Sequence, residues 1–528
     1  WKDEPSKSKK NGFKVVIIGT GVSGLNAAVH LKRAGIPFVI IEKNLEVGGT
    51  WFENRYPGAR VDTASRGYSH QFGVKYPFPH SYGAQETQLE YLKWVTDQYG
   101  FRDNIVFNTE VKSMAWDERE KKWEINAEGA NGACSFNANA VICCVGFLSR
   151  AQLPDIDGIE SFQGEYTHTA QWPEGLDVSN KRVAVIGSGA SGYQLLPVIA
   201  KEASYTHFFQ RTPSWCFPDP DYRKPIPEEV LWLEQNLPYY VNFARFRLAA
   251  MRSPDEFKQK AQVDPEFKDP HALSAINKAG RDSRIAYIKK VLADKPELIK
   301  RMIPPGPPMT SRPLRACPEE NVYTTLLRDD VTLVSDAIER VTPAGIQAGG
   351  TEYEFDVIIY ATGYKANDFL WPMTVTGRDS ASVEDLWAKD GPRAYLSSML
   401  PGFPNFWMSY GPNSNNFGGF QVIDLLELTT QLALRNIAGL IENGYQTVEV
   451  SEDAYWRYQS ELDEVESKMI YRDTRVNNYY TNAHGRSAVN GPIDFRRMWR
   501  WMNDPAGAPA TESDAGIVPN FGKDLIVK

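Results

Sequence analysis

Residues 13–44 read FKVVIIGTGVSGLNAAVHLKRAGIPFVIIEKN, and this stretch decides the fold. A short apolar run enters a glycine pattern of the form GxGxxG, a helical pattern of small and apolar residues follows, and a second apolar run ends at Glu42. This order is typical of a strand, a tight turn, a helix and a second strand, which together bind a dinucleotide. The stretch therefore predicts a Rossmann-like domain near the start of the chain.

Each fixed residue of this pattern has a physical reason. Gly19 permits the tight turn, Gly21 lets a pyrophosphate approach the backbone, and Gly24 lets the helix pack closely on the strand. The helix N-terminus offers amide groups and a dipole to the phosphates. Glu42 lies 18 residues beyond Gly24, where a carboxylate can bind ribose hydroxyls. A glycine-rich turn without a ligand is the alternative, and the flanking strands and the acid speak against it.

The pattern returns in residues 181–215, KRVAVIGSGASGYQLLPVIAKEASYTHFFQRTPSW. We expect a second cofactor to bind at the residues of this turn and helix, namely Gly187, Ser188, Gly189, Gly192 and Gln194. Where a ribose-binding acid would stand after the second strand, the sequence has Arg211 and Thr212. An acid would repel a 2′-phosphate, whereas an arginine binds it through charge-assisted hydrogen bonds. We therefore predict NADPH rather than NADH; a surface arginine without a ligand is the alternative.

Two dinucleotide sites in one chain indicate two electron carriers, and we expect FAD in the first and NADPH in the second. The predicted fold class is α/β, with two Rossmann-like dinucleotide-binding domains and a helical insert. Residues 138–147 (ANAVICCVGF) and 353–368 (YEFDVIIYATGYKAND) each show a buried strand that enters a glycine turn, as where a chain passes between such domains. The expected ranges are 1–148 and 352–528 for the FAD-binding domain, 149–351 for the NADPH-binding domain, and 222–305 for the insert, which shows helical periodicity.

Composition narrows the function classes. The net charge of −8 gives no sign of a nucleic-acid partner. The five cysteines are scattered and form no CxxC pair, so we expect neither a metal site nor a disulfide framework, and we expect a reducing, cytoplasmic compartment. No run approaches the roughly 20 apolar residues of a membrane span. The chain begins at Trp1 with a polar, charged stretch, so we expect further sequence upstream.

The acceptor of the electrons of the reduced flavin can be inferred from the absence of a cysteine pair in the sequence and from the residues that connect the two predicted domains. Disulfide reductases share the two-dinucleotide plan but need a redox cysteine pair, which is not visible here, so dioxygen is the remaining acceptor. Residues 162–173 read FQGEYTHTAQWP and join the two predicted domains. This connector resembles the fingerprint of Baeyer–Villiger monooxygenases and matches it at Phe162, Gly164, His168, Trp172 and Pro173. A second signature of that family is similar to residues 48–62, GGTWFENRYPGARVD.

The resemblance extends from about residue 12 to 500 and implies a reaction. In that family, NADPH reduces FAD, dioxygen gives a flavin C4a-peroxide, and one oxygen atom is inserted next to a ketone carbonyl to give an ester or lactone. The implied partners are a small-molecule ketone and O2. Oxygenation of sulfur or nitrogen is the alternative within flavin monooxygenases, and a flavin sensor or a peroxide-forming oxidase is an alternative of another class. The sequence gives no indication of the oligomeric state.

The resemblance also implies an arginine beside the flavin, because a guanidinium keeps its proton and can stabilise developing negative charge. Residues 304–331 contain two candidates, Arg312 and Arg315. Arg312 stands in the usual position, whereas Arg315 fits a count backwards without gaps from the RDDV stretch at Arg328. We favour Arg312 and keep Arg315 open. Ser311 stands where a lysine is usual, which leaves more of the NADPH preference to Arg211.

The remaining site residues are implied by the matching motifs. Asp62 matches the aspartate that pairs with the catalytic arginine. Further cofactor contacts are implied for Thr50, Trp51, Arg60, Tyr68 and Val111. We expect the connector residues Phe162, Gly164, His168 and Trp172 to couple the domains rather than to act as a base. Residues 411–419 and 482–492 are most similar to the branch that includes 4-hydroxyacetophenone monooxygenase, which favours aryl ketones and leaves other ketones open.

Overall fold

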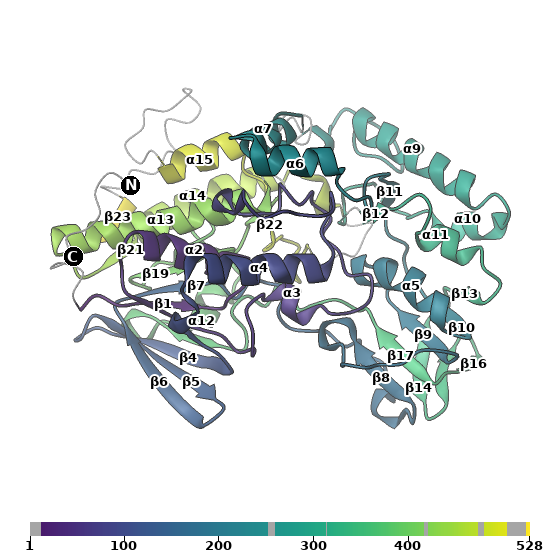
Figure 1. Cartoon of the computed structure of the whole chain (residues 1–528), viewed down its shortest axis with the longest axis horizontal. Coiled ribbons are helices and arrows are strands. Elements are labelled where there is room, and N and C mark those ends of the chain that lie inside the picture. The colour runs from purple at the N-terminus through teal and green to yellow at the C-terminus, as the bar shows by residue number, and fades with distance from the viewer. Residues whose placement is uncertain (1–11, 252–258, 313, 417–420, 474–479, 504–523) are drawn as a thin grey trace.

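The computed structural model describes residues 12–251, 259–312, 314–416, 421–473, 480–503 and 524–528. The expectation of sequence upstream of Trp1 and the end of the 411–419 motif lie outside these described residues. Two lobes stand side by side, each built around a parallel sheet (Figure 1). We call them the first lobe and the second lobe, in the order in which their glycine-rich turns occur.

The sheet of the first lobe has the strand order β19-β7-β1-β2-β3, and all its neighbours are parallel. Its strands are β1 (Val15–Ile18), β2 (Phe38–Ile41), β3 (Ile105–Val106), β7 (Ala140–Cys143) and β19 (Phe406–Met408). Most of their β-branched and apolar residues are buried, as expected for a parallel sheet covered on both faces, whereas the residues of the edge strand β3 are half-buried. Ile18 and Cys143 are partners at the carboxyl edge, which brings the turn at Gly19 beside the turn at residues 144–146.

Helices and a small sheet complete the first lobe. The helices are α2 (Val22–Arg33), α3 (Thr50–Glu53), α4 (Gln85–Tyr99), α12 (Val383–Trp387), α13 (Val422–Asn443), α14 (Glu452–Glu466) and α15 (Phe495–Asn503). Helix α13 packs on α2, where small residues allow a close approach. The small sheet contains β4 (Thr109–Asp117), β5 (Lys122–Gly129), β6 (Gly132–Ala138) and β18 (Thr374–Thr376).

The sheet of the second lobe has the strand order β13-β10-β9-β17-β8 and is also parallel throughout. Its strands are β8 (Glu165–His168), β9 (Arg182–Ile186), β10 (Tyr205–Phe209), β13 (Val331–Val334) and β17 (Val357–Tyr360). Around it lie α5 (Ala190–Glu202), α11 (Val322–Leu326), the pair β11 (Cys216–Pro218) and β12 (Leu314–Ala316), and the antiparallel β14 (Ile338–Thr342), β15 (Gly345–Ala348) and β16 (Thr351–Glu354).

One detail corrects the predicted domain ranges. Strand β17 pairs with β8 and β9, so the return to the first lobe at residue 352 was predicted too early, and the chain crosses back only after Tyr360. The cause is that a short apolar strand does not show in the sequence which sheet it joins. The connector 162–173 contains the edge strand β8 at residues 165–168.

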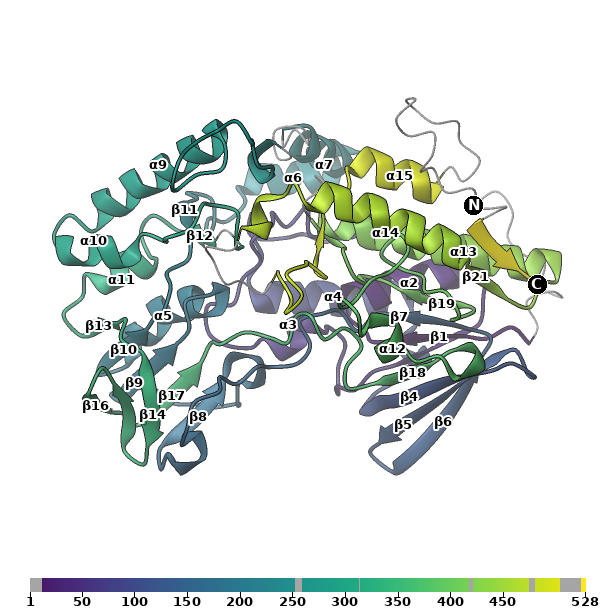
Figure 2. The same cartoon turned by 180° about the vertical axis from the view of Figure 1, so that it is seen from behind.

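The insert contains the helices α6 (Glu228–Asn236), α7 (Tyr240–Met251), α9 (Ala275–Val291) and α10 (Pro296–Met302). It divides between the lobes, as both views show (Figures 1 and 2). Side chains of α9 and α10 join the apolar core of the second lobe, whereas Glu234 of α6 and Arg245 of α7 bond to residues 66–69 of the first lobe. Among the described residues, no helix is both long and apolar enough to cross a bilayer.

Candidate active site between the lobes

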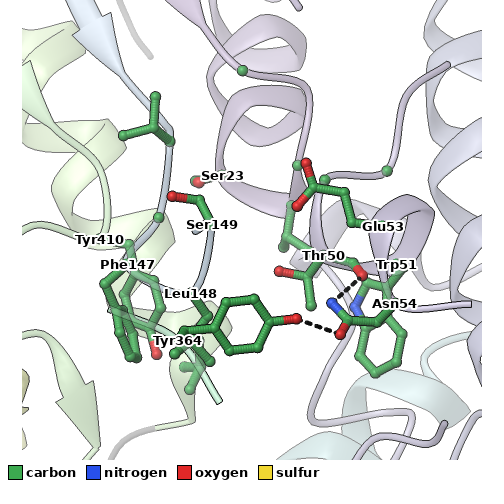
Figure 3. A pocket seen from close by; sticks show the side chains of 18 of the residues that line it. Ser23, Thr50, Trp51, Glu53, Asn54, Phe147, Leu148, Ser149, Tyr364 and Tyr410 are labelled. Atoms are coloured by element: carbon green, nitrogen blue, oxygen red, sulfur yellow. Dashed lines mark hydrogen bonds between the residues drawn. The ribbon is translucent and has the colours of Figure 1, made fainter. Parts of the chain in front are cut away.

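A cavity of about 520 Å³ is lined by residues of both lobes. The first lobe contributes its glycine-rich turn, residues of the 48–63 stretch and the strand ends near Glu42 and Val145. The second lobe contributes the start of α5 and the segment that follows the insert. Figure 3 shows Trp51 and Asn54 on one wall and Phe147 and Tyr410 on the opposite wall.

The first glycine-rich turn has room only for glycine at its decisive positions. Gly19 has φ +97°, and a Cβ there would lie 2.8 Å from the carbonyl oxygen of Cys144. A Cβ on Gly24 would lie 1.9 Å from the carbonyl oxygen of Gly19, so α2 approaches the strand as closely as the motif requires. The turn therefore presents the N-terminus of α2 to the cavity, and it fits the pyrophosphate of a dinucleotide such as FAD.

Glu42 lies at the end of β2, is buried and lines the same cavity. Its Oε2 accepts hydrogen bonds from the backbone N (2.8 Å) and the Oγ1 (2.6 Å) of Thr20, and its Oε1 accepts one from the backbone N of Asn44 (2.8 Å). Burial raises the pKa of this carboxyl, and these hydrogen bonds counteract the effect. A carboxylate can accept about four hydrogen bonds, so capacity remains for a ribose hydroxyl.

The predicted cofactor contacts of the first lobe line the cavity together, namely Thr50, Trp51, Arg60, Tyr68 and Val111. Trp51 donates its indole N–H to the hydroxyl of Tyr68 at 3.3 Å, and the two rings meet edge to face at 5.8 Å. Burial raises the pKa of Tyr68, so its hydroxyl stays protonated at neutral pH. These contacts fix a rigid aromatic corner on one wall of the cavity.

Arg312 and Asp62 form an ion pair at the cavity wall, Nη2 to Oδ2. The side chain of Asp62 is 15% exposed and that of Arg312 is 38% exposed, and Arg312 lines the cavity. Asp62 comes from the first lobe and Arg312 from the second, and the sequence predicted this pairing.

Arg315 is held differently, although it also reaches the cavity. Its Nη1 pairs with Asp219, its Nε donates to the backbone oxygen of Asp62 at 2.6 Å, and both partners of the Asp219 pair are 14% exposed. Its guanidinium carbon also lies over the rings of Tyr82 (4.6 Å) and Phe217 (4.9 Å). These contacts hold Arg315 on several sides, whereas the side chain of Arg312 keeps more exposed surface at the cavity.

The second glycine-rich turn has the same construction as the first. Gly187 has φ +117°, a Cβ there would lie 2.4 Å from the carbonyl oxygen of Ala361, and a Cβ on Gly192 would lie 1.9 Å from the carbonyl oxygen of Gly187. No atom lies within 4 Å of a Cβ built on Gly189, so space is open in front of the turn. The turn fits the pyrophosphate of a second dinucleotide.

Arg211 and Thr212 lie at the end of β10, beside this turn. The Oγ of Ser188 donates to the backbone oxygen of Thr212 at 2.6 Å, which ties the two segments together. Arg211 is exposed, and no described residue forms an ion pair or hydrogen bond with its side chain. Because Arg211 is exposed, its guanidinium is available to a ligand. Arg211 does not line the cavity, so it would meet the outer end of a dinucleotide at the second turn.

Phe162, His168 and Trp172 of the connector are buried away from the cavity. Phe162 lies in an apolar cluster of the second lobe, and Trp172 lies in another that also contains Tyr56 and Ala59 of the first lobe. His168 is 2% exposed, and its Nδ1 accepts a hydrogen bond from the backbone N of Ala170 at 3.0 Å. Burial lowers the pKa of His168 to about 4, so its ring is neutral at physiological pH.

Gly164 completes the connector. A Cβ there would lie 2.6 Å from the carbonyl oxygen of Asp356 and 2.5 Å from the ring of Phe162. Only glycine therefore lets the chain enter β8 beneath that ring.

Three residues of the site have no counterpart among the predicted ones. The ring of His168 meets the ring of Tyr364 edge to face at 6.2 Å, and the hydroxyl of Tyr364 donates to Oδ1 of Asn54, a bond that Figure 3 shows crossing the cavity. Tyr222 donates to Oδ1 of Asp62 at 3.2 Å. Two of these residues had a signal in the sequence, because Asn54 lies within the 48–62 signature and Tyr364 follows a predicted glycine turn. Tyr222 has no such signal.

Within the described residues, no group of three or more His, Cys, Asp or Glu side chains could hold a metal ion.

Comparisons with known proteins agree with this geometry. Residues 12–233 match the family described as flavin-binding monooxygenase-like. A Baeyer–Villiger monooxygenase of Streptomyces coelicolor is 31% identical over 524 residues, which cover 95% of this chain and 96% of the relative. A crystal structure of OTEMO with FAD and NADP is 28% identical, with a TM-score of 0.80 and coverage of 98% and 99%. The closed crystal structure of cyclohexanone monooxygenase is 25% identical, with a TM-score of 0.82 and coverage of 98% and 99%.

Proposed function

The chain belongs to the Baeyer–Villiger monooxygenases, and from this premise we propose how its residues carry out the reaction of that family. It is an FAD- and NADPH-dependent monooxygenase that inserts one oxygen atom of O2 next to a ketone carbonyl. In the balanced reaction, ketone, O2, NADPH and a proton give ester or lactone, NADP+ and water. FAD, when bound, takes the hydride from NADPH and activates dioxygen.

The observation that carries the proposal is the placement of Arg312. Its guanidinium faces a cavity that both glycine-rich turns adjoin, and Asp62 holds it there from the opposite lobe. A guanidinium keeps its charge at any physiological pH, so Arg312 presents a fixed cation to oxygen atoms that become negative during attack on the carbonyl. Asp62 orients Arg312, and the first turn with Glu42 holds FAD.

The second turn has the matching role for NADPH. Gly187, Gly189 and the start of α5 offer backbone amides to its pyrophosphate. The exposed guanidinium of Arg211 binds its 2′-phosphate. The connector couples the two lobes through His168 and Trp172. His168 packs against Tyr364, which bonds to Asn54 of the first lobe, and Trp172 shares an apolar cluster with Tyr56 and Ala59 of that lobe.

An isotope experiment tests the proposal. The FAD-loaded protein is supplied with NADPH, 18O2 and a panel of ketones, and the products are analysed by mass spectrometry together with NADPH consumption and H2O2 release. We expect an ester or lactone that carries one 18O atom per NADPH oxidised. NADPH oxidation that yields only H2O2 with every ketone would assign the chain to the oxidases and contradict the proposal.

Within the ketones, we propose that aryl ketones are favoured. The rings of Phe147 and Tyr410 line the cavity with centroids 5.1 Å apart, and Leu370 and Met373 add apolar surface beside them. Comparison of kcat/KM for an aryl methyl ketone and a cyclic aliphatic ketone tests this choice, and a preference for the aliphatic ketone would contradict it.

We also propose a cytoplasmic location, in keeping with five cysteines that are all free.

A further inference from the structure

Three side chains of the second lobe converge on one residue of the first lobe, Asp62. Arg312 pairs with its Oδ2, Tyr222 donates to its Oδ1 at 3.2 Å, and Arg315 donates to its backbone oxygen at 2.6 Å. Each oxygen of Asp62 thus has a partner from the opposite lobe. Among the described residues, Tyr222 and Arg312 are the two whose side chains bond to the carboxylate itself, so these contacts together determine its orientation.

Tyr222 is itself rigidly held. It is 4% exposed, and its ring meets the ring of Tyr82 edge to face at 5.5 Å. Its hydroxyl accepts a hydrogen bond from Nε2 of Gln194 at 2.9 Å and donates its own proton to Asp62. A carboxylate can only accept, so the direction of the second bond is fixed. Burial raises the pKa of Tyr222 well above its usual value, and the Asp62 carboxylate raises it further, which keeps this proton in place.

Gln194 extends the contact towards the second dinucleotide turn. It is the fifth residue of α5, two residues beyond Gly192. Its Oε1 accepts from the hydroxyl of Tyr56 at 2.8 Å, and its Nε2 also donates to the backbone oxygen of Arg60 at 2.9 Å. The helix that begins at the second turn is therefore connected through Gln194 and Tyr222 to Asp62, and through Asp62 to Arg312.

We infer that Tyr222 is a positioning residue for the oxygenation step: its hydroxyl fixes the Asp62 carboxylate so that Arg312 keeps its place in the cavity. The inference rests on the proposed function, since Arg312 acts there as the fixed cation. Without the hydroxyl, Asp62 can rotate about its side chain, and Arg312, which is 38% exposed, is held less well. Reduction of FAD by NADPH does not need this cation, so the two half-reactions should respond differently.

The test compares Tyr222→Phe with Tyr287→Phe in the FAD-loaded protein. Phe keeps the buried ring at position 222 and removes only the hydroxyl. Tyr287 is a matched control, because its hydroxyl also accepts an amide N–H, from Asn321 at 3.2 Å, and does not contact Asp62. For both variants we measure kcat and KM for the ketone, KM for NADPH, and the ester and H2O2 formed per NADPH.

For Tyr222→Phe we expect ester formation to fall about tenfold, the size typical of losing one hydrogen bond to a charged group. The KM for NADPH should stay within about twofold, and the missing ester should appear as H2O2; Tyr287→Phe should keep wild-type coupling. Equal behaviour of the two variants, or a higher KM for NADPH with coupling intact, would overturn the inference. A wild-type protein that forms no 18O-labelled ester would instead contradict the proposed function.

A second readout does not depend on activity. The thermal midpoint is measured for Tyr222→Phe, Asp62→Ala and the double variant. If Tyr222 acts through Asp62, removal of its hydroxyl should shift the midpoint less once the carboxylate is absent. Additive shifts would show that Tyr222 stabilises the fold independently of Asp62 and would overturn the inference.

Discussion

The two arginines near Asp62 differ in what their side chains can still do. Arg315 has an ion pair, a backbone acceptor and two aromatic neighbours, whereas Arg312 keeps an exposed guanidinium at the cavity. The sequence alone left both candidates open, because alignment by spacing fails where a proline-rich stretch varies. Burial and contacts separate them.

We predict that Arg312→Ala abolishes ester formation and leaves FAD binding and NADPH oxidation largely intact. The reason is that the variant removes the fixed cation and neither glycine-rich turn, and losing preorganised charge of this kind costs about 100- to 1,000-fold in rate. Product analysis and stopped-flow reduction of the flavin measure the two halves separately. Full ester yield in the variant would move the role to Arg315.

Arg315→Ala serves as the contrasting variant. It leaves Asp219 without its cation in a site that is 14% exposed, so we expect a clear loss of thermal stability.

At the second dinucleotide site, we predict that Arg211→Ala raises the KM for NADPH at least tenfold and leaves the KM for NADH nearly unchanged. A charge-assisted contact to the 2′-phosphate exists only with NADPH. Steady-state kinetics with both cofactors checks the prediction. Its control is Arg340→Ala, a charge change on β14 of the same lobe, and an equal effect of Arg211→Ala on both cofactors would show that Arg211 does not bind the phosphate.

Residue types with a geometric signature could be predicted, and those without one could not. Gly19 and Gly187 need positive φ, and Glu42 and Asp62 stand in motifs with fixed spacing, so the sequence indicates them. Tyr222 bonds to Asp62, which lies 160 positions away, and the residues beside Tyr222 in the sequence form no motif that predicts this contact.

Among the elements, the strands beside the two glycine-rich turns and the strands β7 and β17 followed from their apolar runs, while the sheet membership of β17 did not. Strand β17 reads like any buried strand, and only its pairing with β8 and β9 assigns it to the second lobe. The connector could be identified from its motif, but its edge strand β8 reads Glu-Tyr-Thr-His and has no apolar run that would predict a strand. Membership depends on contacts between distant segments, which local patterns do not contain.

Helix α13 carries a buried acid that makes its packing sensitive to pH. Glu427 is 2% exposed and accepts a hydrogen bond from the backbone N of Gln71 at 2.6 Å. Burial raises the pKa of Glu427 from 4.5 to about 7, although Arg245 counteracts this and Asp424 adds to it. Between these pH values the folded protein keeps a proton that the unfolded chain has released, so the contribution of Glu427 to stability falls as pH rises.

We predict that Glu427→Gln removes this part of the pH dependence. The wild-type protein should lose stability relative to the variant between about pH 4.5 and 7, by on the order of 2–3 kcal/mol. Thermal midpoints of both proteins at several pH values give the difference curve. That comparison cancels buried histidines such as His70, whose lowered pKa acts in the opposite direction. A flat difference curve would show that Glu427 is ionised in the folded protein throughout.

At the scale of the whole molecule, the helical insert of the second lobe also contacts the first lobe. Glu234 of α6 forms a buried ion pair with Arg66 of the first lobe, with side chains 6% and 7% exposed. Arg245 of α7 donates to the backbone oxygens of Arg66 (2.7 Å) and Ser69 (2.6 Å). Helices α6 and α7 are therefore fixed to the first lobe, although the sequence assigned the whole insert to the NADPH domain.

We predict that Glu234→Gln loosens α6 without disturbing either sheet. The variant leaves the buried Arg66 without its counter-ion, which costs on the order of 2 kcal/mol or more. Hydrogen–deuterium exchange should speed up in residues 228–236 and stay unchanged in β1 and β9. Glu229→Gln, on the exposed face of the same helix, is the control. Exchange that rises throughout the molecule would mean that the ion pair supports the entire fold.

Because three second-lobe side chains converge on Asp62, we also expect a particular order in which the protein loses its activities during storage. Heat or solvent that loosens only the contacts at Asp62 displaces Arg312, whereas each glycine-rich turn lies within its own lobe and does not depend on these contacts. A stored preparation should therefore keep oxidising NADPH and releasing H2O2 after its ester yield has declined. For anyone who uses the protein as a biocatalyst, NADPH consumption would overstate the active fraction, and shelf life should be followed by product.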